Sequence, residues 1–183
     1  TLKQSTTFNK TYADTNSDGF VDRITETMTQ NGKASIFEQD TLLAKKTMVS
    51  PAGRVLTSFY NPANLLTPKL TIPNFHDTNY GYDNKGRLTT LNRNARTTTF
   101  NYNHQGFLGS ITDPEKKTVS YRYDATGRVT QISRPDGTAI GFSYDANGNT
   151  TVIRTPSAID HRFAYNKVNL NSAYAEPLSG VYG

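Results

Sequence analysis

A stretch of oxygen-bearing residues near the N-terminus has the spacing of a calcium-binding loop. Its candidate ligands are Asp14, Asn16, Asp18, the backbone carbonyl of Phe20, and Asp22. These residues stand at positions 1, 3, 5, 7 and 9 of the segment, and Gly19 at position 6 permits the sharp turn that such a loop needs. Because three crowded carboxylates repel one another without a cation, the segment predicts a structural Ca²⁺ site.

The sequence around this loop favours β-strands over the helices of an EF-hand. An EF-hand needs Glu at position 12, where this chain has Thr25. Residues 20–27 alternate as a strand does, and the loop resembles the calcium loops that join strands in extracellular β-repeat proteins. Asn31-Gly32 predicts a tight turn between residues 20–30 and 33–40. The alternative is an Asx-rich turn that binds no metal.

The three histidines do not form a recognisable catalytic group. His104 falls in a turn position, where we expect a solvated side chain. His76 and His161 each stand beside an Asp, and adjacent residues of a strand point to opposite faces. The chain contains no nucleophile motif and no glycine-rich phosphate loop. The sequence therefore predicts a protein that is not an enzyme and has no catalytic residues.

An internal repeat determines the elements that would position these residues. Tyr recurs at positions 82, 102, 123, 144 and 165, which gives a period of 20 or 21 residues. Two copies carry the whole pattern Tyr-x-Tyr-Asp-x-x-Gly-Arg, at residues 80–87 and 121–128. A third copy has Asn149 in place of the Arg, and residues 49–55 form a degenerate earlier copy.

Each part of the repeat has a physical reason that predicts a β-hairpin. Two aromatic residues at i and i+2 share one face of a strand. Asp then opens a turn, Gly supplies the left-handed residue, and a β-favouring run such as Arg-Leu-Thr returns. Second turns are predicted at 113–116 and 134–137. The returning strand has apolar residues at the odd spacing of Leu88 and Leu91, so either a bulge re-aims one, or both faces of the sheet are partly covered.

Composition agrees with a thin β structure and excludes several classes of protein. Only 34% of the residues are hydrophobic, but 11 Tyr and 9 Phe supply aromatic area for a one-layer sheet. The absence of Cys excludes disulfides and cysteine-based zinc sites. No apolar stretch approaches the roughly 20 residues of a membrane helix, so membrane insertion is not expected. The net charge of +5 is spread over dispersed Lys and Arg, which does not favour a nucleic-acid partner.

The repeated unit is similar to the YD or RHS repeat. This repeat is known from bacterial Rhs proteins, the C components of insecticidal toxin complexes, wall-associated bacterial proteins and animal teneurins. The resemblance covers about residues 78–166, or 47–166 with the degenerate copy. It implies a β-strip that spirals into a hollow shell, which in several family members encloses a toxic C-terminal domain. Four or five copies are too few to close such a shell, so that role would belong to a larger parent protein.

These observations predict an all-β fold, an antiparallel meander of repeated hairpins. We expect an N-terminal hairpin segment with the calcium-type loop (residues 1–45), a YD-repeat strip (46–166) and a C-terminal tail or edge strand (167–183). Three prolines predict an irregular connector between Asn61 and Asn74 rather than a central strand.

The predicted function is structural, as part of a β-shell or a self-assembling surface fibre of a secreted or cell-surface protein. Its expected partners are other copies of the chain or further repeats of a parent chain, with a toxin cargo or a surface glycan also possible. The alternative is an extracellular module that binds carbohydrates or receptors, since rows of exposed Tyr, Asn and Asp can dock sugars as well as form cross-strand ladders.

Overall fold

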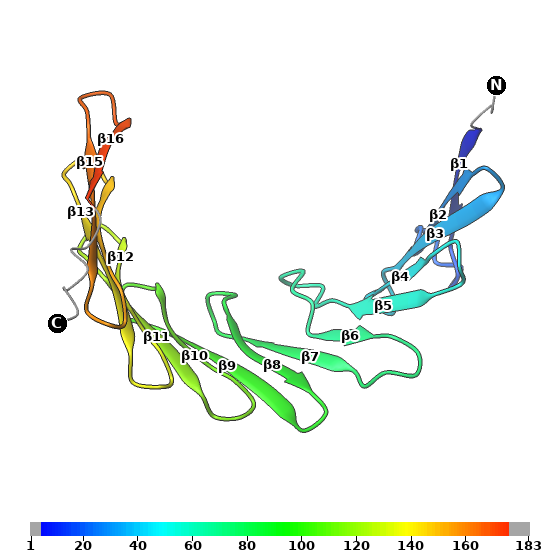
Figure 1. Ribbon diagram of the computed structural model, residues 1–183. Helices are drawn as coiled ribbons and strands as arrows, with labels where there is room; N and C mark the ends of the chain where they lie inside the picture. The colour runs from blue at the N-terminus through cyan, green and yellow to red at the C-terminus, as the bar shows by residue number, and fades with distance from the viewer. Residues whose placement is uncertain (1–4, 176–183) are drawn as a thin grey trace. The chain divides into compact units, whose positions relative to one another are not determined.

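The computed structural model describes residues 5–175, and they contain strands and no helix (Figure 1). The all-β prediction is therefore confirmed. The strands are β1 (Thr6–Ala13), β2 (Arg23–Gln30), β3 (Lys33–Asp40), β4 (Lys45–Val49), β5 (Val55–Phe59), β6 (Lys69–Thr71), β7 (Thr78–Tyr82), β8 (Leu88–Arg93), β9 (Arg96–Tyr102), β10 (Leu108–Thr112), β11 (Thr118–Tyr123), β12 (Val129–Ser133), β13 (Ala139–Tyr144), β14 (Thr150–Arg154), β15 (Asp160–Tyr165) and β16 (Asn171–Ala175). A helix long and apolar enough to cross a membrane is not found in this part of the chain.

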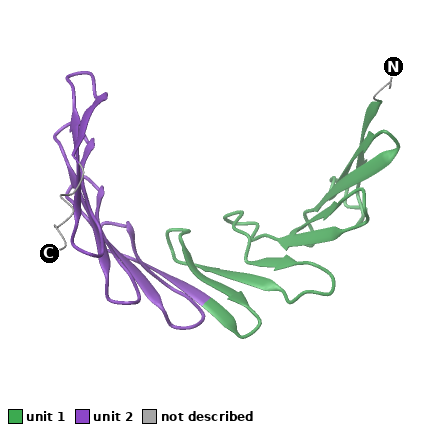
Figure 2. Cartoon of the chain, in the orientation of Figure 1, with its two compact units in different colours: residues 1–97 green, residues 98–183 purple. Residues whose placement is uncertain are grey.

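Every strand pairs with its neighbours in the sequence, as the predicted meander requires. The strand order runs from β1 to β16 without a crossover, and each pair for which the register is known is antiparallel. The chain divides into two compact units, residues 1–97 (unit 1) and 98–183 (unit 2), which Figure 2 colours separately. Short connections between consecutive strands account for this order, because they leave each hairpin no other partner within reach.

A β-bulge in the repeat hairpins explains the odd spacing of their apolar residues. In the β7–β8 hairpin Tyr80 pairs with Leu91 and Tyr82 pairs with Leu88, and the register shifts between these pairs. The bulge adds one residue to the returning strand, so both leucines face the side of the two tyrosines. The same shift recurs in four further hairpins (β9–β10, β11–β12, β13–β14 and β15–β16). Of the two explanations that the sequence left open, the bulge is confirmed.

The apolar side chains form a thin layer instead of a closed core. Among the described residues no hydrophobic residue is buried, and the repeat tyrosines are half-buried. The buried residues are Asp22, which is 5% exposed, and Asp40, which is 2% exposed. Asp40 accepts a hydrogen bond from the Arg23 guanidinium at 2.8 Å and another from the Leu43 N–H. This guanidinium, as the largest cause, lowers the pKa of the Asp40 carboxyl.

The N-terminal hairpin has the predicted turn. β2 and β3 pair over eight residues around Asn31 and Gly32, whose φ angles of 52° and 76° are both left-handed. Two such residues make the type I′ turn that matches the twist of a hairpin. β2 begins at Arg23 rather than at residue 20, and its other side pairs with β1 across the aspartate-rich segment 14–22.

The region predicted as an irregular connector contains a short strand, so that prediction is wrong in part. β6 spans Lys69–Thr71 and pairs with β5 on one side and β7 on the other. The three prolines of this region, Pro62, Pro68 and Pro73, all lie outside its three residues. They remove no N–H from its ladder and therefore do not prevent pairing.

Candidate functional sites: the repeat hairpins and the aspartate-rich loop

The YD turn is held by one aspartate that accepts hydrogen bonds from the backbone and side chains of the residues that follow it. The Asp124 Oδ1 accepts the N–H of Thr126 at 2.9 Å and that of Arg128 at 3.0 Å, while Oδ2 accepts the Arg128 Nε at 2.7 Å. Two backbone bonds close the loop, from the Gly127 N–H to the Asp124 carbonyl and from the Asp124 N–H to the Arg128 carbonyl. Asp, Gly and Arg therefore recur together because one turn uses all three.

The same bonds hold the turns of the other copies. Asp83 accepts the N–H of Lys85 and that of Arg87, and the Arg87 guanidinium contacts its second oxygen at 2.7 Å. In the third copy the Asn149 amide replaces the arginine and donates to Asp145 Oδ2 at 2.9 Å. The hydrogen bonds to the turn aspartate are therefore kept even where the arginine of the repeat is replaced.

The degenerate copy keeps this backbone geometry with a weaker side chain. Ser50 stands in the place of Asp, and its Oγ accepts the Arg54 N–H at 3.1 Å. The Gly53 N–H donates to the Ser50 carbonyl, as Gly does in the full copies. Residues 49–55 therefore fold as an early member of the series.

Consecutive hairpins are joined by the hydroxyl of the second tyrosine. This hydroxyl donates to a carbonyl fifteen residues earlier, Thr67 for Tyr82, Leu108 for Tyr123 and Val129 for Tyr144, at 2.7–3.0 Å. Partial burial raises the pKa of the Tyr123 hydroxyl. A phenylalanine at these three positions would keep the ring but lose this bond, which gives a physical reason for Tyr there.

Arginine makes a second link between hairpins. The Arg128 guanidinium lies over the Tyr144 ring, with its Cζ 4.8 Å from the ring centroid, and donates to the Asp145 carbonyl at 3.1 Å. The guanidinium thus connects its own turn to the ring and the turn of the next copy. Sequence reasoning assigned the arginine only to a β-favouring run, and its position directly after the turn glycine was the available signal.

The turn carboxylates have lowered pKa values. Hydrogen bonds to the ionised form favour it, and for Asp124 the bond from the Arg128 N–H is the largest cause of a pKa well below the usual range. The pKa of Asp83 is lowered chiefly by the Arg87 N–H, and that of Asp145 by the Asn149 amide. These groups are therefore fixed charges of the turns, not proton donors at neutral pH.

The aspartate-rich loop joins β1 to β2 and is organised by its own side chains. Asp14 accepts the N–H groups of Asp18 and Gly19, at 3.2 and 2.8 Å. The Asn16 amide donates to the Asp18 carboxylate at 2.9 Å, and the Asp18 carboxylate also accepts the Phe20 N–H. All of these residues are exposed. No three acidic or histidine side chains within residues 5–175 converge on a point that could hold a metal.

Asp22, the last candidate ligand, differs from the others because it is buried. Its Oδ2 accepts the Thr15 N–H at 2.9 Å and the Thr15 hydroxyl at 2.8 Å. Its Oδ1 is buried and has no hydrogen-bond partner. A buried carboxylate oxygen without a donor is costly, and a cation would remove that cost. The candidate ligands offer oxygen donors of the kind that calcium binds, but their carboxylates do not converge on one point in the described structure.

The model of one protein family, the teneurin YD-shell, matches residues 4–179 of the chain. The chain belongs to the teneurin YD-shell family. The YD or RHS resemblance read from the repeats is thereby confirmed. None of the curated proteins compared matches the sequence.

Solved structures show the same fold for the YD-shell segment. A crystal structure of TcdB2-TccC3-TEV matches 92% of the chain with a TM-score of 0.59 and 12% identity. The Photorhabdus luminescens Tc holotoxin pore with the TccC3 D651A mutation matches 93% of it, with a TM-score of 0.55 and 14% identity. The segment spans only 11% and 10% of those two chains. At such identities the likeness establishes the fold alone.

The three histidines of the YD-shell segment lie in separate places along the chain. His104 is exposed in a turn, as predicted from the sequence. The His161 ring contacts the Tyr174 hydroxyl at 2.6 Å, and His76 lies in an exposed loop. No histidine hydrogen-bonds a carboxylate in the described part of the chain, so no acid–base pair is assembled there.

Proposed function

We propose that the chain is a wall segment of a larger β-shell in a secreted or cell-surface protein. The observation that carries this proposal is the repeated link along the chain, in which the hydroxyls of Tyr82, Tyr123 and Tyr144 each bond a carbonyl fifteen residues earlier. Such a contact lets one hairpin be added to the next without a thick core. The likeness to chains nearly ten times longer supports a segment role.

The shell would enclose a cargo polypeptide, and the segment would act without catalysis. The family resemblance supports enclosure, since shells of this type surround toxic domains in several members. The recurring Asp and Tyr side chains are occupied by the turns and hairpin links, which leaves them unsuited to acid–base chemistry. Self-assembly into a surface fibre is the competing form of the same structural role.

We further propose that Ca²⁺ stiffens the β1–β2 loop. Asp14, Asp18 and Asp22 would supply carboxylate oxygens, with the Asn16 amide and the Phe20 carbonyl completing the set. The buried, unsatisfied Oδ1 of Asp22 supports this assignment. The ion would neutralise the local negative charge and fix the start of β2, and it has no part in any reaction.

The shell proposal is tested on the protein that contains this segment together with its neighbouring sequence. Electron microscopy of that protein should show a hollow particle, and a cargo polypeptide inside it should survive a protease that digests the free cargo. Extended fibres with no interior would support the competing form. Particles with neither an interior nor a repeating polymer would contradict both.

A further inference from the structure

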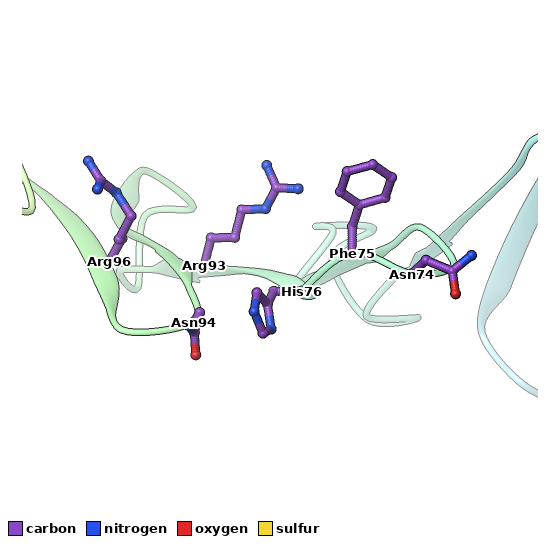
Figure 3. A pocket seen from close by; sticks show the side chains of 6 residues that line it. All are labelled: Asn74, Phe75, His76, Arg93, Asn94 and Arg96. Atoms are coloured by element: carbon purple, nitrogen blue, oxygen red, sulfur yellow. The ribbon is translucent and has the colours of Figure 1, made fainter.

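A hollow in unit 1 is lined by cationic and amide side chains and by no carboxylate (Figure 3). It has a volume of about 540 Å³ and lies between the loop that joins β6 to β7 and the turn that joins β8 to β9. Its lining residues are Asn74, Phe75, His76, Arg93, Asn94 and Arg96. All six are exposed, although Phe75 is a large apolar residue.

Two arginines and one aromatic ring form the upper side of this hollow. Figure 3 shows the side chains of Phe75, Arg93 and Arg96 on the same side of the ribbon, whereas His76 and Asn94 point to the other side. The Arg93 Cζ lies 5.8 Å from the centroid of the Phe75 ring. The Phe75 side chain is 62% exposed, so its ring is open to a ligand.

Neither guanidinium forms an ion pair with a carboxylate in the described part of the chain. The two acidic residues nearest in sequence are already paired, Asp77 with Lys69 at 2.6 Å and Asp83 with Arg87 at 2.7 Å. The charge of Arg93 and Arg96 is therefore not neutralised locally. A guanidinium group without a carboxylate partner suits a planar anion, which it can bind through two parallel hydrogen bonds.

The positive charge of the chain is concentrated in the part of the sequence that contains this hollow. Residues 41–97 contain eight Lys and Arg and two Asp, a net charge of +6 with His neutral, although the chain as a whole carries +5. Residues 1–40 are net negative and residues 98–183 are nearly neutral. Unit 1 thus offers a positive field that raises the local concentration of an anionic ligand.

We propose that this hollow binds an anionic carbohydrate, a sulfated oligosaccharide. Arg93 and Arg96 pair with its sulfate groups, and the exposed Phe75 ring stacks on a sugar face. This site goes beyond the proposed structural role, because a shell wall needs no uncompensated arginines.

A single-stranded nucleic acid is the less favoured ligand. Binding along its backbone requires a groove of positive charge with several aromatic platforms for successive bases. The hollow provides one ring and two guanidinium groups, which match one charged sugar unit rather than a strand. Nucleic-acid binding is therefore an outcome that the test must separate from carbohydrate binding.

The test measures affinity of the full chain for a sulfated hexasaccharide by calorimetric titration. The double variant Arg93→Gln, Arg96→Gln should weaken binding at least about tenfold, since two charge-assisted contacts are lost. Phe75→Ala should weaken it about threefold to tenfold through the lost stacking. The matched control Arg54→Gln, Lys85→Gln removes the same charge from exposed turn positions of unit 1 and should stay within about twofold of the wild type.

Several outcomes would overturn the carbohydrate assignment. Equal weakening in both double variants would mean that general charge attraction, not the hollow, binds the ligand. The desulfated hexasaccharide, inorganic sulfate and a single-stranded oligonucleotide of equal charge are titrated in parallel. Binding of any of these as tight as that of the sulfated sugar would contradict the proposal, as would no measurable binding of the sulfated sugar. Each variant should melt at the same temperature as the wild type, which shows that weaker binding is not caused by unfolding.

Discussion

Arg128 shows how one side chain of the repeat acts in two hairpins at once. It pairs with Asp124 in its own turn and lies over Tyr144 of the next copy. Arg128→Ala should therefore lower the free energy of unfolding by about 1–2 kcal/mol, from the lost cation–π contact and ion pair. Urea denaturation followed by circular dichroism measures the change.

The matched control is Arg122→Ala, because Arg122 is exposed on β11 and makes no ion pair among the described residues. That substitution should change stability by less than about 0.5 kcal/mol. Equal effects of the two substitutions would mean that the contacts of Arg128 contribute nothing measurable.

Alanine substitutions at two turn glycines distinguish the energetic cost of a left-handed backbone from the cost of a steric clash with a neighbouring side chain. Gly127 and Gly137 have similar left-handed φ angles, 86° and 83°. A Cβ on Gly127 would meet the Phe107 ring at 2.6 Å, whereas one on Gly137 would meet no atom within 4 Å. Gly137→Ala should cost about 1–2 kcal/mol from backbone strain alone.

Gly127→Ala should cost about 1–3 kcal/mol more than Gly137→Ala, because the added methyl displaces Phe107 from its 5.0 Å contact with the Tyr123 ring. The difference between the two melting midpoints isolates this crowding. A Phe107→Ala background should abolish it, and a difference that persists there would contradict the explanation.

At the scale of the hairpin, the turn carboxylates make stability depend on acid. The Arg128 N–H, as the largest cause, holds the pKa of Asp124 far below the value of about 3.9 expected in the unfolded chain. The pKa of Asp124 is lower in the folded state than in the unfolded state. The ionised carboxylate therefore makes its full contribution to the free energy of unfolding above about pH 4, and this contribution is lost as the pH falls toward the folded-state pKa. The melting temperature should be level from pH 7 to 5 and should fall below pH 4.

Asp124→Asn tests this origin of the pH dependence. The variant should melt at a lower temperature at pH 7, but its melting temperature should fall less steeply between pH 4 and pH 2. Glu115→Gln provides the control, because the Glu115 side chain is exposed and bonds Lys117 rather than a backbone N–H. A slope unchanged by Asp124→Asn would show that other groups carry the acid sensitivity.

The proposed Ca²⁺ site in the aspartate-rich loop predicts that the stability of unit 1 depends on calcium. Ca²⁺ at a hundred times its dissociation constant should stabilise the folded chain by about 2.7 kcal/mol, and chelation should reverse this. Asp22→Asn should remove most of the calcium response, since it changes the carboxylate whose Oδ1 is buried without a partner. Asp113→Asn, in a turn of unit 2, should keep the full response. If the melting temperature does not change with calcium, the assignment of the calcium site is wrong.

The sequence determines the hairpins better than it determines the weak elements between them. Aromatic pairs, Asp and Gly recur at fixed spacing, so the strands, the turns and their order were all predictable. β6 was missed because three residues between prolines carry no periodic signal. The hollow was missed for a related reason. Phe75 and Arg93 are eighteen residues apart and come together only because β6, β7 and β8 pair in order.

At the scale of the whole molecule, the exposed apolar surface of β1 to β4 predicts association. Phe8, Tyr12, Met28 and Met48 lie on one face of these strands, because paired residues and residues two apart share a face. Their exposed fractions run from 47% to 65%. β1 itself pairs only with β2 among the described strands, so one side of its backbone can accept another strand.

The isolated chain should therefore self-associate as its concentration rises, in a way that depends on β1. Sedimentation velocity should show oligomers whose fraction grows with concentration, and Phe8→Lys with Tyr12→Lys should shift the chain toward monomer through charge repulsion at the edge. Leu42→Lys with Leu43→Lys adds the same charge at an exposed turn and should leave association unchanged. A chain that stays monomeric at every concentration would mean that β1 is not a joining edge.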